Sequence, residues 1–341
     1  MRRWKKRPEG SNWGEFGDDD QRGRINLITP ELRKRAAGEI VEGISFCLSL
    51  PLDYPGGSDL IKIRQEPRLF CVTREGGAPA YNFPWRAMTC NCEHLDVTSD
   101  DAVTLFTQYS TQWDALAHYG QLFDADDDGQ EEIVFYNGFR AGSDILGPQE
   151  GSDEPRARAL GIENLAEAAV QGRGTMVNLH AEYGLDRVAV GYDALMRVIE
   201  KQKVDVRKGD ILCIYTGFDD LLLSMNKRPD VKKLRSVGTG LDGGDEKLQQ
   251  WIDDSGIAAI AADNTAVEFL PAPRTQPGAR ALLPLHAHCL FKLGIHLGEL
   301  WFLRDLAAWL HARGRSSFFL TAPPLRLPGS VGSPLTPVAT V

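Results

Sequence analysis

The sequence predicts a single domain of the mixed α/β class, and two observations support this fold class. Segments typical of strands interleave along the chain with segments typical of helices. No stretch of biased composition reads as a linker, so one domain is favoured over two in a chain of 341 residues. Residues 1–40 are rich in Gly, Asp and Arg, and we expect them to form an irregular N-terminal arm before a domain over residues 41–341.

Local signals predict each element in turn. Thr29 and Pro30 mark a helix start, because proline is favoured at the first helical position, and the helix should cover residues 32–37. Residues 211–215 form a compact apolar run after Gly209-Asp210, which is typical of a buried strand. The other expected strands are residues 44–50, 68–73, 102–112, 132–136, 174–179, 257–262 and 317–321. The other expected helices are residues 162–169, 192–201, 247–254 and 297–312, and residues 142–156 should form a surface loop.

The composition is that of an ordinary globular protein, with 43% hydrophobic and 25% charged residues. A net charge of −9 argues against a nucleic-acid partner, and the basic run at residues 2–7 is expected to be a solvated tail. No apolar region follows that run as in a signal peptide, and no 18-residue apolar run could span a membrane. Six scattered cysteines do not form a dense disulfide framework, so we expect a cytoplasmic protein.

Residues 108–118 (QYSTQWDALAH) are the first candidate site. On a strand, Gln108, Gln112 and Asp114 would share one face, and neighbours two residues apart lie roughly 6.6 Å apart, close enough to share a cation. Gln108 could join them only across a bend or bulge. A strand edge that faces water explains the same pattern.

A second candidate site lies between residues 286 and 299, which hold His286, His288, His296 and Glu299. Imidazole and carboxylate groups are common metal ligands, so this spacing is compatible with ligation or catalysis. The structural alternative is that Glu299 opens the expected helix, where the helix dipole favours a carboxylate, and that His296 caps or packs.

Two other patterns lack the context that their chemistry needs, and a third is absent. Residues 238–243 fit G-x-G-x-x-G but follow a charged segment instead of a buried strand. Residues 124–129 begin like an EF-hand loop, but Phe135 occupies the twelfth position, so an acidic turn is favoured. No G-x-S-x-G nucleophile elbow is present.

The chain resembles the cyclase superfamily of metal-dependent hydrolases, which includes bacterial kynurenine formamidase and isatin hydrolase. The signature H-x-G-T-H-x-D-x-P-x-H is matched at Thr111, Asp114 and His118, and further similar stretches extend the resemblance over residues 11–340. The resemblance implies a swivelling β/β/α core, a homodimer or homotetramer, and a divalent metal, zinc or manganese.

The resemblance also implies roles for individual residues. Asp114 and Glu299 would be metal ligands, with His286 preferred over His288 as the histidine ligand, and His118 would be the catalytic acid/base. Gln108 and Gln112 replace the two signature histidines, and an amide oxygen is a hard donor that Mn²⁺ tolerates better than Zn²⁺ does. A single ion is therefore expected.

The activity implied is hydrolysis of a C–N or C–O acyl bond in a cyclic or aryl amide, imide, formamide or lactone. The alternatives are a metal-assisted cyclase or lyase, and a non-catalytic protein that binds a small molecule. Aromatic residues could line a substrate pocket or belong to the core, and His180 could approach the site. The aromatic candidates are Trp13, Trp113, Tyr215 and Phe218.

Overall fold

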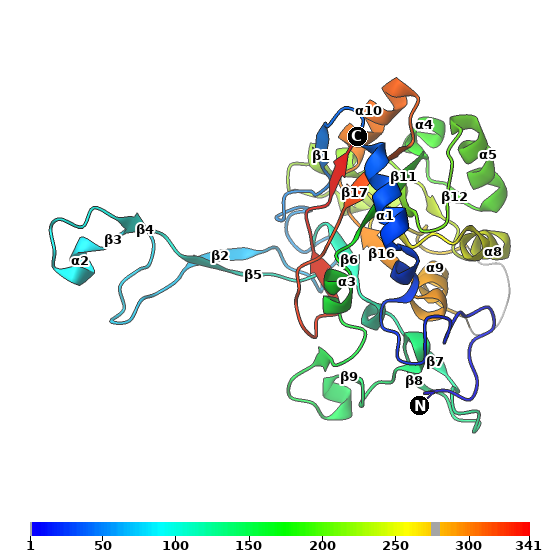
Figure 1. The fold of residues 1–341 in the computed structure, drawn as a ribbon, viewed down its shortest axis with the longest axis horizontal. Helices are drawn as coiled ribbons and strands as arrows, with labels where there is room; N and C mark the ends of the chain where they lie inside the picture. Colours follow the sequence, from blue (N-terminus) through cyan, green and yellow to red (C-terminus); the bar gives the residue numbers. More distant parts are fainter. Residues whose placement is uncertain (1, 274–279) are drawn as a thin grey trace.

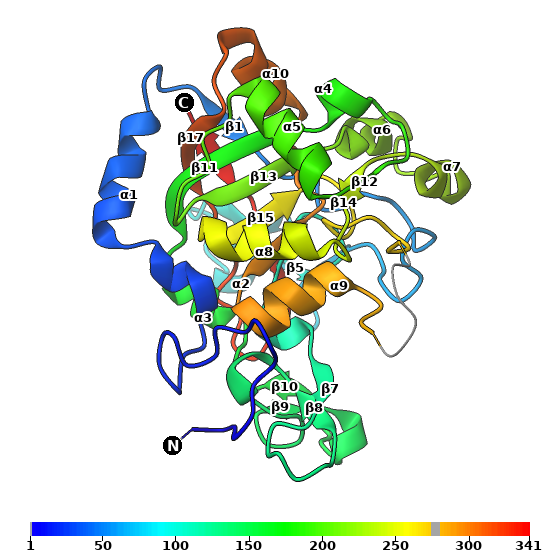
Figure 2. The same cartoon turned by 90° about the vertical axis from the view of Figure 1, so that its right-hand side faces the viewer.

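A nine-stranded sheet forms the centre of the computed structural model, which describes residues 2–273 and 280–341 (Figures 1 and 2). Four central strands, β11, β13, β15 and β16, run parallel, and the strands outside them pair antiparallel. In sheet order, the strands are β1 (Ser45–Cys47), β19 (Val338–Thr340), β17 (Ser317–Thr321), β11 (Gln171–Asn178), β13 (Ile211–Tyr215), β15 (Ala259–Ala262), β16 (His296–Glu299), β6 (Gln112–Asp114) and β18 (Gly332–Pro334). The predicted mixed α/β domain is confirmed.

Helices cover both faces of this sheet and create two hydrophobic cores. Figure 2 shows α5, α8 and α9 across one face, while α10 packs on the other. The alternation of strand side chains divides β13 between the two cores: Leu212 and Ile214 join the first, and Ile211 and Cys213 join the second. The helices are α1 (Pro30–Ala36), α3 (Glu163–Glu167), α4 (His180–Tyr183), α5 (Tyr192–Gln202), α6 (Phe218–Ser224), α7 (Val231–Ser236), α8 (Glu246–Ser255), α9 (Pro284–His286) and α10 (Arg304–Arg313). A π-helical segment, Ala287–Leu293, continues α9.

Two expected elements are wrong in a way that matters for the site. The single strand over residues 102–112 is two strands, β5 (Asp101–Thr104) and β6, separated by turns. The expected helix over residues 297–312 begins only at Arg304, because residues 296–299 form β16 in the middle of the sheet. Glu299 therefore ends a strand and does not open a helix.

Residues 61–107 form an extension that projects far from the body (Figure 1). It consists of two small antiparallel sheets, in which β2 pairs with β5 and β3 pairs with β4, together with one short helix. Its further elements are β2 (Arg68–Cys71), β3 (Phe83–Pro84), α2 (Arg86–Thr89) and β4 (Val97–Thr98).

Short hairpins complete the described part of the chain. The expected acidic turn joins β7 to β8, and the expected loop at residues 142–156 contains β9 and the start of β10. The remaining strands are β7 (Gln121–Phe123), β8 (Glu132–Val134), β9 (Ile145–Leu146), β10 (Arg156–Ala157), β12 (Ala189–Val190) and β14 (Gly240–Leu241). In the described residues, no helix has the length and apolar character that crossing a membrane requires.

The N-terminal arm packs closely on the body. Asn12 Nδ2 donates to the carbonyl of Leu293 (2.9 Å), and Trp13 Nε1 donates to the carbonyl of Phe291 (2.8 Å). Both contacts satisfy carbonyls near the end of the π-helical segment, where intrahelical donors run out. The arm thereby anchors the helix that carries His286.

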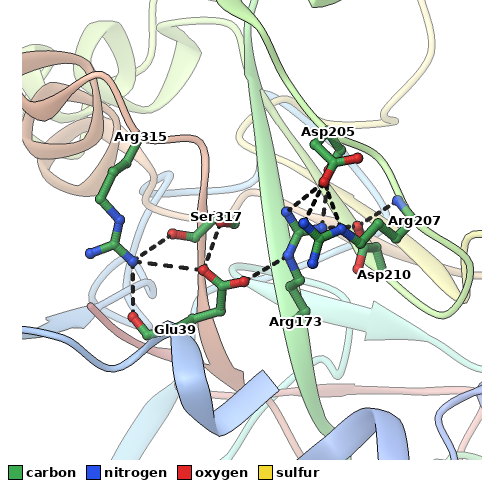
Figure 3. Close-up of polar contacts among 7 residues, drawn as sticks. All are labelled: Glu39, Arg173, Asp205, Arg207, Asp210, Arg315 and Ser317. Carbon is green, nitrogen blue, oxygen red and sulfur yellow. Dashed lines mark hydrogen bonds and ion pairs between the residues drawn. The ribbon is translucent and has the colours of Figure 1, made fainter. Parts of the chain in front are cut away.

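A polar cluster ties the segment after α1 to the sheet (Figure 3). It comprises Glu39, Arg173, Asp205, Arg207, Asp210, Arg315 and Ser317. Arg173 projects from β11 with only 10% of its side chain exposed, and donates to Asp210 (2.5 Å) and Glu39 (2.9 Å). The two carboxylates compensate a largely buried cation.

Candidate metal centre

Asp114, His286 and Glu299 form a buried cluster whose candidate ligand atoms all lie within 4.8 Å of one another. Asp114 ends β6, Glu299 ends β16, and His286 ends α9. The antiparallel pairing of β6 with β16 places Gln112, the first residue of β6, opposite Glu299, the last residue of β16. Asp114 lies two residues after Gln112, on the same face of β6. His286 Nε2 lies 3.4 Å from Glu299 Oε1.

Gln112 lies between the two carboxylates of this cluster. Its Nε2 donates to Glu299 Oε2 (2.9 Å) and is 3.3 Å from Asp114 Oδ1. Gln112 Oε1 and Asp114 Oδ2 are buried and have no hydrogen-bond partner among the described residues. Buried oxygens are normally satisfied, so two orphan acceptors beside a carboxylate pair favour a cation.

Glu268 orients the imidazole of His286. Glu268 Oε1 lies 2.7 Å from His286 Nδ1, and the same carboxylate accepts from the backbone N–H groups of Leu285 and His286. A proton on Nδ1 leaves the Nε2 lone pair directed toward Glu299. A carboxylate behind a histidine is the usual arrangement around a metal-binding imidazole.

The electrostatics of the cluster also favour a cation. Burial lowers the pKa of His286, but hydrogen bonds to Glu268 and Glu299 and the charge of Asp114 outweigh it and raise the pKa to about 10. Burial, followed by the charge of Asp114, raises the pKa of Glu299 to about 7. His286 and Glu299 therefore retain protons near neutral pH, and a divalent ion would displace these protons on binding. Two carboxylate oxygens and one imidazole nitrogen fit Mn²⁺ or Zn²⁺.

His118 borders this cluster and is more exposed than its members. It ends the 3₁₀ turn Leu116–His118, and 24% of its side chain is exposed. The distance between His118 Nε2 and Asp114 Oδ1 is 3.8 Å. Desolvation lowers the pKa of His118, and the charge of Asp114 only partly opposes this. The lowered pKa keeps this imidazole neutral near neutral pH, which is the form that a general base requires.

Two other predicted ligands form no hydrogen bond with the side chains of the cluster within the described residues. His288 Nε2 is 2.9 Å from the carbonyl of Gln249 on α8, so its ring points away from Glu299. Gln108 accepts from Thr107 through Oε1 (2.9 Å), and it has no hydrogen bond to the cluster within the described residues. Of the candidate ligands Gln108, Gln112, His286 and His288, Gln112 and His286 lie beside the carboxylates.

The aromatic candidates are placed differently from one another. Trp13 packs against Phe291, and Trp113 packs against Trp301 with no exposed surface. Both tryptophans belong to the core, so the expectation that they line a substrate pocket is wrong. Phe218 does line a cavity, described below. Tyr215 stacks on His180 with 5.6 Å between the ring centroids, so the His180 ring packs on Tyr215 and is not part of the cluster.

Glu268 is the site residue that the sequence reasoning missed. It belongs to no motif and lies 18 residues before His286. The available signal was a single acid inside an otherwise apolar run over residues 266–270 (AVEFL), since a charge in such a run requires a buried partner.

Comparison with known proteins identifies the family. The model of the Cyclase family matches residues 48–269. The crystal structure of a novel cyclase is 31% identical, with 97% of this chain and 99% of that chain covered and a TM-score of 0.74.

More distant structures share the fold. Isatin hydrolase A from Labrenzia aggregata is 14% identical, with 90% and 95% of the two chains covered and a TM-score of 0.54. Isatin hydrolase A from Ralstonia solanacearum is 14% identical, with 91% and 95% covered and a TM-score of 0.53. No curated protein matches this chain significantly. The chain belongs to the cyclase family.

Proposed function

We propose that the protein is a metal-dependent hydrolase of a C–N or C–O acyl bond in a cyclic or aryl amide, imide, formamide or lactone. The observation that carries this proposal is the buried cluster of Asp114, His286 and Glu299, with Glu268 behind the imidazole and His118 at the exposed edge. One divalent ion per subunit, manganese or zinc, would be held by Asp114, His286 and Glu299. The cyclase-family fold, which isatin hydrolases share, supports the reaction type.

A bound divalent ion would supply Lewis-acid polarisation of an acyl carbonyl and would lower the pKa of water. His118 would take the proton from the attacking water and deliver it to the leaving nitrogen or oxygen. Asp114, 3.8 Å from the His118 ring, would stabilise the imidazolium between these two transfers. Glu268 would keep His286 in the tautomer that presents Nε2.

A second candidate is a small-molecule-binding protein without catalysis. The amide group of Gln112 supports it, because its Nε2 group already donates to one oxygen of each carboxylate. The family also suggests a metal-assisted cyclase or lyase, in which the same acid/base residue would open or close a ring without net hydrolysis.

Turnover assays can separate these functions. The purified protein would be given isatin, formanilide, phthalimide and dihydrocoumarin with Mn²⁺, with Zn²⁺ or with a chelator, in ¹⁸O-labelled water. Hydrolysis requires metal-dependent turnover with ¹⁸O in the product. His118→Ala should lower kcat by about 10²- to 10⁴-fold and keep the bound metal, whereas His311→Ala, an exposed histidine on α10, should change neither.

Two results would contradict the proposal. Turnover without ¹⁸O incorporation would favour the cyclase or lyase. Failure to bind any metal stoichiometrically, together with no turnover, would favour the binding protein.

A further inference from the structure

A cavity of about 400 Å³ lies beside the candidate metal centre. Two of its lining residues connect it to that centre. Glu268 holds the Nδ1 atom of His286, and the backbone carbonyl of Asn264 accepts from Leu300, the residue after Glu299. The cavity and the cluster therefore share a wall. Its volume lies in the usual range of about 300–1,000 Å³ for small-molecule sites.

The walls of this cavity are mainly apolar and include aromatic rings. The apolar lining residues include Leu60, Ile61, Phe218, Leu234, Val237 and Phe269. They come from the base of the extension, from α6, from the region of α7 and from the segment after β15. Such walls stabilise the flat hydrocarbon part of a ligand by burying its surface and by stacking.

Two arginines give the cavity a positive charge. Arg187 stacks over the ring of Phe269, 4.4 Å from its centroid, and donates to the carbonyl of Leu270 (2.5 Å). Arg235 lies on α7. In the part of the chain that the structure describes, neither arginine forms an ion pair, although the chain carries a net charge of −9.

The acidic group in the cavity lining does not neutralise these arginines. Glu268 is the only acidic residue among the described lining residues, and its carboxylate is engaged by His286 and by two backbone N–H groups. Guanidinium groups recognise carboxylates with paired hydrogen bonds, and both arginines are exposed at the rim of the cavity, where a ligand can reach them.

We propose that this cavity binds the substrate of the adjacent centre, and that the substrate is a ring-bearing carboxylate. Its ring would pack between Phe218 and Phe269, and its carboxylate would pair with Arg187 and Arg235. This inference rests on the proposed function, because it names the ligand as the substrate of that reaction. Binding of the ligand itself requires no hydrolysis. It narrows the substrate class from amides, imides and lactones in general to those that carry a negative charge on or near the ring.

Equilibrium binding of benzoate and benzamide, which have the same ring but differ in charge, tests the inference. Titration calorimetry on chelator-treated protein removes any contribution from a metal ion. We expect benzoate to bind at least tenfold more tightly than benzamide. Arg187→Met and Arg235→Met should each weaken benzoate binding at least fivefold and leave benzamide binding unchanged. Arg197→Met, an exposed arginine on α5, is the matched control and should change neither constant.

Each alternative outcome has a distinct meaning. Equal binding of the two probes, or benzoate binding that both arginine variants retain, overturns the carboxylate preference. Benzoate binding that appears only with Mn²⁺ and ignores the arginines also overturns it, because the ion would then be the binding group, while the proposed hydrolase stands. Arginine-dependent binding in a protein that hydrolyses nothing supports the cavity and contradicts the hydrolase. Circular dichroism melts of each variant exclude unfolding as the cause of lost binding.

Discussion

Glu268 and His286 form a buried pair, with 2.7 Å between Oε1 and Nδ1, and this pair fixes which imidazole nitrogen faces Asp114 and Glu299. The carboxylate is held in turn by the backbone N–H groups at the start of α9. The orientation of the proposed histidine ligand is therefore built into the backbone and does not depend on a bound ion.

Replacing Glu268 with Gln should weaken metal binding without unfolding the protein. A neutral amide holds the Nδ1 proton less strongly and lowers the basicity of Nε2. The loss of such a partner typically costs about 10- to 100-fold in metal affinity. Titration of Mn²⁺ into the chelator-treated protein measures the change, and Glu200→Gln, an exposed glutamate on α5, is the control. Unchanged affinity would show that Glu268 does not orient His286.

Replacing Gln112 with Leu should destabilise the metal-free protein more than the metal-loaded protein. Gln112 donates to both Glu299 and Asp114, and neither carboxylate is appreciably exposed. Without the amide, each loses a donor, at a cost of roughly 1–3 kcal/mol for each unsatisfied group. A bound ion compensates the same oxygens, so the difference in Tm from wild type should shrink when Mn²⁺ is added.

Thermal unfolding with and without Mn²⁺ measures this difference. Gln250→Leu, at an exposed position on α8, should show the same small effect in both conditions. An equal loss for Gln112→Leu in both conditions would mean that its amide does not stand in for a cation.

The extension should mediate self-association, so the expected homodimer or homotetramer stays a prediction with a specific test. Half of the large hydrophobic side chains that are exposed in the described residues lie between Ile63 and Phe106. Two-stranded sheets are marginal in water, and exposed apolar patches usually mark interfaces. Leu69 and Val103, directly paired between β2 and β5, are 73% and 44% exposed.

Light scattering after size exclusion would give the mass of the wild type and of the double variant Leu69→Asp with Val103→Asp. We expect an oligomer for the first and a smaller species for the second. Leu122→Asp, at an exposed leucine on the body, should keep the wild-type mass. A monomeric wild type would contradict the prediction.

The sequence alone predicted the elements whose local pattern matches their burial. Both faces of β13 are covered, so its five residues form an uninterrupted apolar run with predictable ends. β6 and β16 could not be predicted in this way, because they are short and their residues depend on distant contacts. One such contact joins the residues that flank the two strands: Thr111 Oγ1 donates to the carbonyl of Leu300 (2.5 Å).

The candidate site was predictable in its members but not in its detail. Asp114, His118 and Glu299 follow from the resemblance, whereas the choice between His286 and His288 needs the fold. Residues two apart on a helix point about 200° apart, so only one of the two can face the cluster. That rule could have excluded joint ligation, but the sequence gives no sign of which face is inward.

Asp219 should make the stability of the protein depend on pH. It is buried next to Asp263 and accepts from the backbone N–H groups of Leu303 and Arg304, which connects α6 to α10. Burial raises the pKa of Asp219 to about 6 despite these hydrogen bonds, above its ordinary value of 3.8. A carboxyl with a raised folded-state pKa contributes stability that is fully present below pH 3.8 and is lost as the pH rises through about 6.

Urea unfolding between pH 4 and pH 7 tests this expectation. The free energy of unfolding of the wild type, relative to Asp219→Asn, should fall across the window by at most about 1.4 kcal/mol per pH unit. Asp193→Asn, at an exposed position on α5, should give a difference that is constant with pH. If the free-energy difference between the wild type and Asp219→Asn does not change with pH, Asp219 is not the titrating group, and its neighbour Asp263 is the alternative.

Arg173 should be among the most sensitive positions outside the metal centre. Arg173→Met leaves the carboxylate of Asp210, which is 2% exposed, and that of Glu39 without their shared cation. Removing one partner of a buried pair costs about 3–5 kcal/mol, because the remaining charge stays desolvated. Urea unfolding at neutral pH measures the loss, with Arg197→Met as the exposed control. Adding Asp210→Asn to Arg173→Met removes one stranded charge and should recover part of the stability. A loss below about 1 kcal/mol for Arg173→Met would mean that solvent reaches the cluster and screens the carboxylates, as in a surface ion pair.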